Sequence, residues 1–281
     1  MDIRQKYKDY CESKGIRFQD DTSILSYDDT SLFCPAGMQQ FKNQFNDDQY
    51  KDTCSNIQSC LRLNDIDEIG DGTHLLYFNM IGLFSFREMT LQESINFWIE
   101  FLEEELKLEI SYITIHPDKL QEWKSLYDSR FEIREDLECI WSDGGELKGY
   151  CTEFYIDGVE IGNIVNTRED CIDVGFGLER LDMFVNKIEK SEIDILKETI
   201  VKMIESGVFV SNNNQGYVLK KLIRILIRKG VVLEIEEFQN EVVKYNKMLE
   251  RYDKLKVKDK NKNKTSEWWW DTHGIDVSQI D

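Results

Sequence analysis

The segment 173–180 (DVGFGLER) carries the residues whose types and spacing point most directly to chemistry. Glycines at alternate positions, Gly175 and Gly177, leave one face of a strand bare, so a flat ligand can lie against the backbone. Arg180, at the start of a following helix, can then reach the ring or the phosphates of that ligand. Asp173 places a carboxylate at the beginning of the segment. The pattern predicts a ligand site, and an ordinary strand–helix junction with packing glycines is the alternative.

Basic residues form a second group, at near-helical spacing, between residues 220 and 229. Such a stripe can lie against phosphates, whose contacts position a nucleic acid without reading its sequence. The alternative is a solvated helix face. The members of this basic stripe are Lys220, Lys221, Arg224, Arg228 and Lys229.

The composition limits the kinds of protein that this chain can be. With 35 basic and 54 acidic residues its net charge is −19, which lowers the expectation of nucleic-acid binding because Lys and Arg supply most contacts to phosphate. The seven cysteines contain no CxxC pair and the three histidines lie far apart, so we expect reduced thiols and no zinc or other metal site. No apolar run approaches the ~18–20 residues of a membrane span. A charged N-terminus without a secretory signal completes the expectation of a cytoplasmic protein.

The elements expected to position these residues begin with strands and a few helices. Two apolar runs around the polar turn NDIDEIGDG predict an antiparallel hairpin over 56–87. Apolar residues recur at helical spacing over 91–108, and residues 1–15 predict a shorter amphipathic helix that ends at Gly15. Further strands are expected within 110–117 and 137–165, and the segment 171–186 begins as a strand and becomes helical.

Beyond residue 187 the pattern changes to helical periodicity, over 190–207, 216–230 and 236–256. The run 254–264 (KLKVKDKNKNK) predicts a charged loop. We therefore predict an α+β fold. An antiparallel sheet flanked by helices is expected over 1–187, followed by a mostly helical domain over 188–281.

Eight segments, in order, resemble the catalytic core of the alanyl-tRNA synthetases, a family of class II aminoacyl-tRNA synthetases. The segment that ends in Arg180 resembles motif 3 of the class, and the segment that ends in Arg62 resembles motif 2. An ordered set of eight is far more specific than any one match, and together they span most of residues 20–281. The segments are 31–42 (SLFCPAGMQQFK), 60–62 (CLR), 77–86 (YFNMIGLFSF), Trp141 with 151–153 (CTE), 160–165 (EIGNIV), 173–180, 211–230 and 270–274 (WDTHG).

This resemblance implies that the carboxylate of an amino acid attacks the α-phosphate of ATP, giving an aminoacyl-adenylate and pyrophosphate. Such a step depends on positioning and charge neutralisation, without a protein nucleophile. By similarity, Arg62 would hold the α-phosphate. Phe78 would stack on adenine, with Arg180 on the other face or against the triphosphate. Gly175 and Gly177 would let the nucleotide approach the strand, and Mg²⁺ is expected with ATP.

The resemblance also implies which residues bind the other two substrates. Asp173 matches the carboxylate that pairs with the α-ammonium group, and Trp141 and Asn163 match residues of the amino-acid pocket. Asn212 and Asp271 match the pair that reads the wobble base pair in the acceptor stem of the alanine tRNA. The basic residues expected to contact that tRNA between them are Lys220, Lys221 and Arg224.

Several features depart from the family pattern. The turn after Arg62 is short and acidic, where the family has glycines and a lysine. Asn79 replaces a glutamate. Gly162 replaces a tryptophan, so we expect an amino-acid pocket larger than alanine needs. Nothing follows Asp281, so the editing and oligomerising modules are expected to be missing and the protein to be a monomer.

Three functions fit these observations. The first is a ligase that activates alanine, or a related small amino acid, and transfers it to tRNA; the matches at Asn212 and Asp271 favour it. The second is an adenylating enzyme with another acceptor, such as a carrier-protein thiol, a peptide or a small molecule; the acidic turn, the charge and Gly162 favour it. The third is a non-catalytic paralogue that acts by binding.

Overall fold

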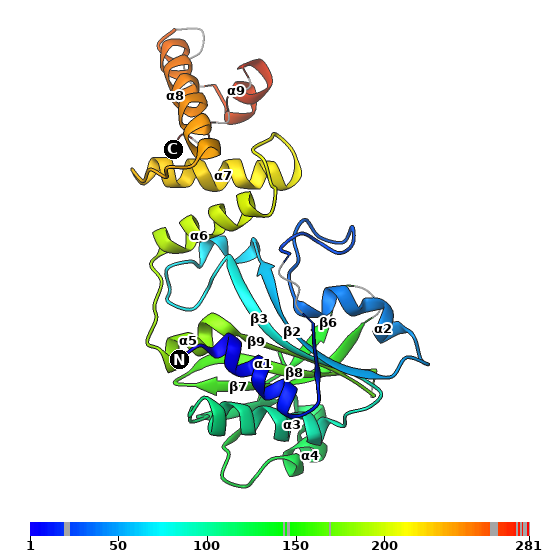
Figure 1. The fold of residues 1–281 in the computed structure, drawn as a ribbon. Helices are drawn as coiled ribbons and strands as arrows, with labels where there is room; N and C mark the ends of the chain where they lie inside the picture. Colours follow the sequence, from blue (N-terminus) through cyan, green and yellow to red (C-terminus); the bar gives the residue numbers. More distant parts are fainter. Residues whose placement is uncertain are drawn as a thin grey trace. The chain divides into compact units, whose positions relative to one another are not determined.

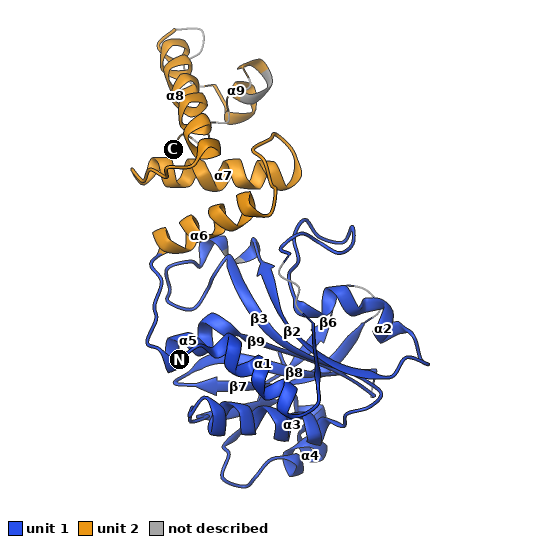
Figure 2. Cartoon of the chain, in the orientation of Figure 1, with its two compact units in different colours: residues 1–191 blue, residues 192–281 orange. Residues whose placement is uncertain are grey.

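The computed structural model divides into two compact units, Met1–Ser191 and Glu192–Asp281 (Figure 2). This division lies four residues from the expected boundary at 187, and the roles expected of the two domains stay predictions. The side chains of Asp65, Trp270 and Asp271 are outside the description. The structure describes residues 1–19, 23–142, 144, 147–168, 170–258, 264–273, 275, 277 and 280.

A nine-stranded sheet forms the centre of the first unit (Figure 1). Its hydrogen-bonded order is β1-β2-β3-β9-β8-β7-β4-β5, and β6 pairs with β7. The strands are β1 (Arg17–Gln19), β2 (Asp52–Leu61), β3 (Tyr77–Phe86), β4 (Tyr112–Ile115), β5 (Ile133–Glu135), β6 (Ile140–Ser142), β7 (Lys148–Ile156), β8 (Val159–Thr167) and β9 (Cys171–Gly177).

The predicted sheet flanked by helices is confirmed, with a correction to the direction of its outer strands. The pairs β1–β2 and β4–β5 are parallel, whereas the other pairings are antiparallel, so the sheet is mixed. Parallel neighbours need a crossover connection, and α4 (Pro117–Trp123) lies in the one between β4 and β5. The predicted hairpin is confirmed as β2–β3, in which Leu61 pairs with Tyr77 and Asp52 with Phe86.

One face of the sheet packs against helices through stacked aromatic rings. Trp98, on α3 (Leu91–Glu100), stacks on Phe176 of β9 with ring centroids 4.2 Å apart. Tyr7, on α1 (Ile3–Ser13), stacks on Trp98 and donates its hydroxyl to the carbonyl oxygen of Gly82 at 2.9 Å. Leu181, on α5 (Leu178–Val185), joins the same buried core. The residues of β3 and β9 that face this core are therefore unavailable to a ligand.

Two predicted helices are shorter than their patterns suggest. Helix α3 begins at a capping box between Thr90 and Glu93, but it ends at Glu100. A π-helical turn, Phe101–Glu105, continues it, and the amide of Leu106 donates to the carbonyl of Phe101 five residues back at 3.0 Å. Helix α1 ends before Gly15, whose φ of +72° suits glycine.

The opposite face of the sheet is covered at one end only by short helical segments. These are the 3₁₀ turn η1 (Gly37–Phe41) and α2 (Lys42–Asn46). Phe41 packs on Phe84 with ring centroids 4.5 Å apart, and Phe45 packs on Phe86 at 4.9 Å. Because side chains alternate along β3, the residues that precede Phe84 on this face can line a cavity. Further 3₁₀ turns are η2 (Asn64–Asp67) and η4 (Lys124–Leu126).

The second unit is helical, as predicted. Its helices are α6 (Glu192–Glu205), α7 (Asn214–Arg228), α8 (Glu236–Lys256) and α9 (Ser266–His273). The charged run 254–264 begins inside α8, and residues 259–263 of that run lie outside the described residues. Within the described part of the chain, no helix is both long and apolar enough to cross a membrane.

Candidate active site

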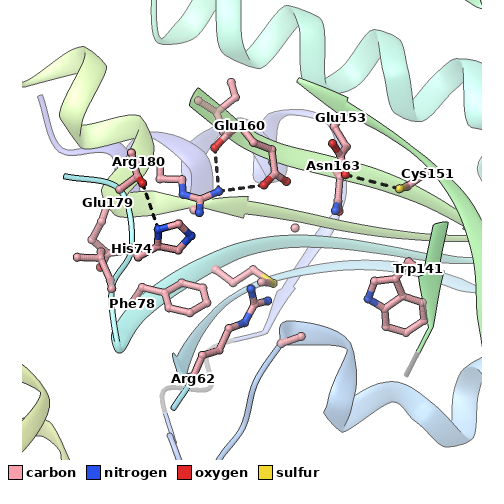
Figure 3. A pocket seen from close by; sticks show the side chains of 18 of the residues that line it. Arg62, His74, Phe78, Trp141, Cys151, Glu153, Glu160, Asn163, Glu179 and Arg180 are labelled. Atoms are coloured by element: carbon pink, nitrogen blue, oxygen red, sulfur yellow. Dashed lines mark hydrogen bonds and ion pairs between the residues drawn. The ribbon is translucent and has the colours of Figure 1, made fainter. Parts of the chain in front are cut away.

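A cavity of about 400 Å³ opens on the sheet face opposite α1 and α3 (Figure 3). Strand β3 shows why: Phe78 and Met80 line the cavity, whereas Ile81 and Leu83 belong to the core under the helices. Every site residue predicted in the first unit lines this one cavity. They are Arg62, Phe78, Trp141, Asn163, Asp173, Gly175, Gly177 and Arg180.

Strand β9 supplies the floor of the cavity as its alternating glycines predict. Asp173, Gly175 and Gly177 line the cavity, and Phe176 between them packs into the core. A Cβ atom at Gly175 would lie 2.8 Å from Sδ of Met80, so the flexible Met80 side chain would have to shift to make room for it. The glycine leaves the strand backbone bare at this position, so a ligand can approach it closely.

Asp173 is a buried carboxylate at the amino-acid end of the predicted site. It is 8% exposed, and burial raises the pKa of its carboxyl to about 7. Among the described residues, none forms a hydrogen bond or ion pair with its side chain. A carboxylate in this state gains a partner when a cation enters the cavity, and a substrate ammonium group is such a cation.

Arg62 and Phe78 lie against each other at the mouth of the cavity (Figure 3). Arg62 follows the end of β2, and its guanidinium lies 5.0 Å from the centroid of the Phe78 ring. Its Nε atom donates to the carbonyl oxygen of Pro35 at 3.0 Å. The two residues come from strands paired between Cys60 and Phe78, so the hairpin brings them together. Contacts of both with ATP stay predictions.

Arg180 reaches the cavity from the first turn of α5, but it already has an acidic partner. Its Nη1 atom donates to the carbonyl oxygen of Glu160 at 2.9 Å and to the carboxylate of the same residue at 3.0 Å. A nucleotide phosphate would compete with Glu160 for this guanidinium. Glu160 lies in the segment 160–165 that resembles the family, but its sequence position predicted no role for it.

The replacement of a glutamate by Asn79 has a structural counterpart in Glu179. Asn79 is buried, and its backbone and side-chain amides donate to the Glu179 carboxylate at 2.9 and 2.8 Å. Burial raises the pKa of Glu179, and the two donated hydrogen bonds oppose that rise. A second carboxylate at position 79 would instead repel the first.

Gly162 lines the cavity, as expected, but with its backbone only. A Cβ atom there would lie 2.4 Å from the Phe176 ring, so the missing side chain leaves room for that ring in the core. Asn163, the next residue on β8, faces the cavity as predicted. A strand alternates its side chains between two faces, and sequence likeness alone did not identify which face position 162 occupies.

The cavity also contains ionisable residues to which the sequence analysis assigned no role. Glu153 on β7 is half-buried, and desolvation raises the pKa of its carboxyl. His74 lies between two acids, with Nδ1 2.6 Å from Asp71 and Nε2 3.1 Å from Glu68. The sequence did contain a signal for Glu153. It stands two residues after Cys151, which lines the cavity, on a predicted strand, and residues two apart on a strand face the same side.

The residues predicted to contact tRNA lie in the second unit, and only some are exposed. Asn212 is exposed and accepts a hydrogen bond from Nζ of Lys220 at 2.9 Å. Lys220 is itself buried, as is Arg224, which pairs at 2.7 Å with Glu241 of α8. Lys221 is exposed. The side chain of Asp271 lies outside the described residues.

These positions correct the expectation of one continuous basic stripe. Helical spacing places Lys220 and Arg224 together, but on the face of α7 that packs inside the unit. The exposed cations of the stripe are Lys221, Arg228 and Lys229, and Lys229 pairs with Glu192 at 2.8 Å. The roles of these residues toward tRNA stay predictions.

Curated relatives of the chain are alanine–tRNA ligases. The enzyme of Francisella tularensis subsp. tularensis (strain WY96-3418) is 29% identical over 306 residues, which cover 82% of this chain and 35% of that protein. The enzyme of Francisella tularensis subsp. novicida (strain U112) is 29% identical over 334 residues, covering 90% and 39%. The chain thus spans little more than a third of these relatives.

Two solved structures are loosely similar, both of pyrrolysyl-tRNA synthetase from Desulfitobacterium hafniense. One has a TM-score of 0.41 at 12% identity and covers 65% of this chain and 67% of that chain. The other has a TM-score of 0.38 at 13% identity, covering 68% and 70%. The family model described as tRNA synthetases class II (A) matches residues 2–198, which include every residue that lines the cavity. The chain therefore belongs to the class II (A) tRNA synthetases and resembles their alanyl members.

Proposed function

We propose that the protein activates alanine, or a related small amino acid, with ATP and transfers it to the 3′ end of tRNA. What supports this proposal most is that eight residues predicted from separate motifs line one cavity. Those motifs resemble an adenylate-forming enzyme, and the relatives named alanine–tRNA ligase support the choice of alanine. Because the chain spans about a third of those relatives, each part of the reaction is tested separately.

In the proposed reaction the chain acts by positioning and by charge. Asp173 is buried and has no cationic partner among the described residues, and it would receive the α-ammonium group of the amino acid. The substrate carboxylate would then attack the α-phosphorus of ATP, and pyrophosphate would leave. Arg62 and Arg180 would offset the charge that develops on the phosphate oxygens. ATP would enter as its Mg²⁺ complex, which screens the β- and γ-phosphates.

Amino-acid-dependent exchange of pyrophosphate into ATP, across the twenty amino acids, tests the activation step. We expect exchange with alanine or a near relative, and its loss in Asp173→Ala. The matched control is Asp9→Ala, which removes an exposed carboxylate on α1, outside the cavity. An enzyme that exchanges pyrophosphate equally well without Asp173 contradicts the assigned role. Absence of exchange with every amino acid contradicts activation and favours the non-catalytic paralogue.

A second acceptor deserves a separate test because the turn between β2 and β3 is acidic. Asp67, Glu68 and Asp71 are exposed there, and the cavity nearby contains Glu153 and Glu160. Carboxylates at this place would repel the phosphates of a tRNA end. The alternative function is therefore transfer of the activated amino acid to a carrier-protein thiol, a peptide or a small molecule.

Transfer of radiolabelled alanine distinguishes the two acceptors. With the activation step established, the label is followed into purified tRNA and, in parallel, into a carrier protein that bears a phosphopantetheine thiol. Label that enters acid-precipitable tRNA and is released by mild base supports the ligase. Label that stays as free adenylate with tRNA, but reaches the thiol, supports the alternative.

A further inference from the structure

Two cysteines and a glutamate converge at one wall of the cavity. Cys139 precedes β6, whereas Cys151 and Glu153 lie two residues apart on β7 and so share one face of the sheet. The two sulfur atoms and a carboxylate oxygen of Glu153 all lie within 4.8 Å of one another. Sγ of Cys151 is 3.9 Å from Oε1 of Glu153 (Figure 3).

These separations suit a small tetrahedral cation. With Zn–S bonds of about 2.3 Å and Zn–O bonds of about 2.1 Å, tetrahedral ligands lie about 3.6–3.8 Å apart. From separations of at most 4.8 Å, the ligand atoms would need to approach one another by about 1 Å to reach that geometry, which small rotations within rotamer wells allow. We propose that Cys139, Cys151 and Glu153 bind one Zn²⁺ ion.

The polar groups around the three side chains support a metal site. Tyr155 donates its hydroxyl to Oε2 of Glu153 at 2.8 Å, which leaves Oε1 directed toward Cys151. Thr114 on β4 links two of the ligands, with its hydroxyl 3.1 Å from Sγ of Cys139 and 3.4 Å from Oε2 of Glu153. Partners of this kind hold metal ligands in orientation.

The arrangement leaves one coordination position open to the cavity. Cys139 and Cys151 are buried, at 0% and 2% exposure, but Cys151 and Glu153 also line the cavity. Three protein ligands with a fourth open position are typical of catalytic zinc sites, where water or a substrate atom completes the tetrahedron. Two sulfur ligands favour Zn²⁺ over Mg²⁺, which prefers oxygen. The site stands independently of the amino acid or acceptor that the enzyme uses.

The sequence gives no spacing signal for this site, because its two cysteines lie twelve residues apart. Pairing of β6 with β7 brings them together: Ile140 pairs with Tyr150, and the amide of Cys151 donates to the carbonyl of Cys139 at 2.9 Å. The expectation of no zinc site rested on the absence of a CxxC pair and of clustered histidines. That argument does not apply to a pair of cysteines joined across strands.

Metal content of the full chain tests the proposal. The protein is stripped with a chelator under a phosphine reductant, incubated with zinc sulfate, and separated from free metal before elemental analysis. We expect about one zinc per chain in the wild type and less than about a fifth of that in Cys139→Ser and Cys151→Ser, since each change removes a ligand. Glu153→Gln, which keeps the shape of the side chain, is expected to weaken zinc binding at least tenfold.

The matched control is Cys171→Ser, because Cys171 is equally buried but belongs to a different cluster around Phe86. It should bind zinc like the wild type. Cobalt reconstitution of the wild type adds a reading that needs no variant: two thiolate ligands produce an intense near-ultraviolet charge-transfer band. A wild type that binds no zinc and gives no such cobalt band overturns the proposal. So does zinc retained in both cysteine variants.

Discussion

At the scale of single residues, the ionisable side chains of the cavity differ in whether a neighbouring group offsets their charge. Arg180 is paired with Glu160, and Glu179 accepts two hydrogen bonds from Asn79. Asp173 has burial alone, which raises the pKa of its carboxyl to about 7. In a protein interior an uncompensated carboxylate is destabilising unless it is protonated or meets a cation. If Asp173 binds the substrate ammonium group as proposed, substrate binding and stability are coupled directly at this residue.

The raised pKa of Asp173 predicts a stability that falls with pH. The carboxyl holds its proton up to about pH 7 in the folded chain but only to pH 3.8 when unfolded. The stabilising contribution of this carboxyl to the free energy of unfolding is therefore fully present below about pH 4, and it is lost as the pH rises to about 7. The Asp173→Asn variant has no carboxyl to ionise and so avoids this loss. The difference between its free energy of unfolding and that of the wild type should therefore shift in favour of the variant by up to about 4 kcal/mol between pH 4 and pH 7.

Urea unfolding of both proteins at pH 5 and pH 8 checks this prediction. The variant should gain on the wild type at the higher pH while losing pyrophosphate exchange at both. In the wild type, the KM for the amino acid should fall over the same range, because an ammonium group prefers the ionised carboxylate. A constant stability difference at the two pH values contradicts an elevated pKa.

At the scale of elements, alternation along the strands decides which residues meet a substrate. On β8, Gly162 faces the aromatic core and Asn163 faces the cavity. On β9, Phe176 packs against Trp98 while its neighbours Gly175 and Gly177 line the cavity. Neighbouring residues of one strand therefore serve different faces: one face packs in the core, and the other lines the cavity that we propose to be catalytic.

This alternation predicts opposite effects for two neighbouring substitutions. Gly162→Ala places a Cβ atom 2.4 Å from the Phe176 ring, and overpacking of this kind costs about 1–3 kcal/mol. Asn163→Ala should change stability by less and raise the KM for the amino acid. Thermal unfolding and exchange kinetics of the two variants provide the comparison. A changed amino-acid preference in a stably folded Gly162→Ala variant would contradict the placement of this residue in the core.

The helices of the second unit yield a prediction about the buried pair of Arg224 and Glu241. Glu241 is 1% exposed and its carboxylate lies 2.7 Å from the guanidinium. Arg224→Ala leaves that carboxylate buried without its partner, which costs about 3–5 kcal/mol. Lys221→Ala, an exposed cation three residues earlier on the same helix, should change stability by less than about 0.5 kcal/mol.

Denaturation and tRNA binding, measured on both variants, separate structure from recognition. Lys221→Ala should leave unfolding unchanged and weaken tRNA binding, in proportion to the loss of one phosphate contact. Arg224→Ala should instead lower the free energy of unfolding, so any weaker tRNA binding in that variant would accompany a loss of stability. An Arg224→Ala variant with wild-type stability would show that the pair contributes little to the packing of α7 on α8.

At the scale of the whole molecule, the division into two units separates the parts of the proposed reaction. Every residue that lines the candidate active site, from Ala36 to Arg180, belongs to the unit Met1–Ser191. The residues matched to tRNA recognition belong to the unit Glu192–Asp281. A net charge of −19 means that any contact with tRNA depends on a few local cations.

A chain shortened to residues 1–191 tests this division. It contains the whole cavity, so we expect amino-acid-dependent pyrophosphate exchange close to that of the full chain. Transfer to tRNA should fall at least about tenfold, since a loss of about 1.4 kcal/mol of binding suffices for that. Circular dichroism establishes that the shortened chain is folded. A folded 1–191 chain without exchange would show that the second unit contributes to activation.

The sequence by itself determined the family, the strand hairpin, the helical second unit and eight of the residues that line the cavity. It could do so because ordered motifs and the periods of strands and helices are local properties of a chain. Arg62 and Asp173 needed no tertiary structure to be identified as candidates. Their meeting in one cavity required only that the expected sheet form.

Only the tertiary structure decided which face of each element packs inside. Helical spacing grouped Lys220 with Arg224 but could not show that both are buried. Likeness to the family placed Gly162 beside the pocket, where its backbone does lie, but it could not show that the Phe176 ring occupies the space of the missing side chain. The pairing of Glu160 with Arg180 and the approach of Cys139 to Cys151 join residues from different segments. Such contacts arise from strand pairing and packing, which local sequence patterns do not encode.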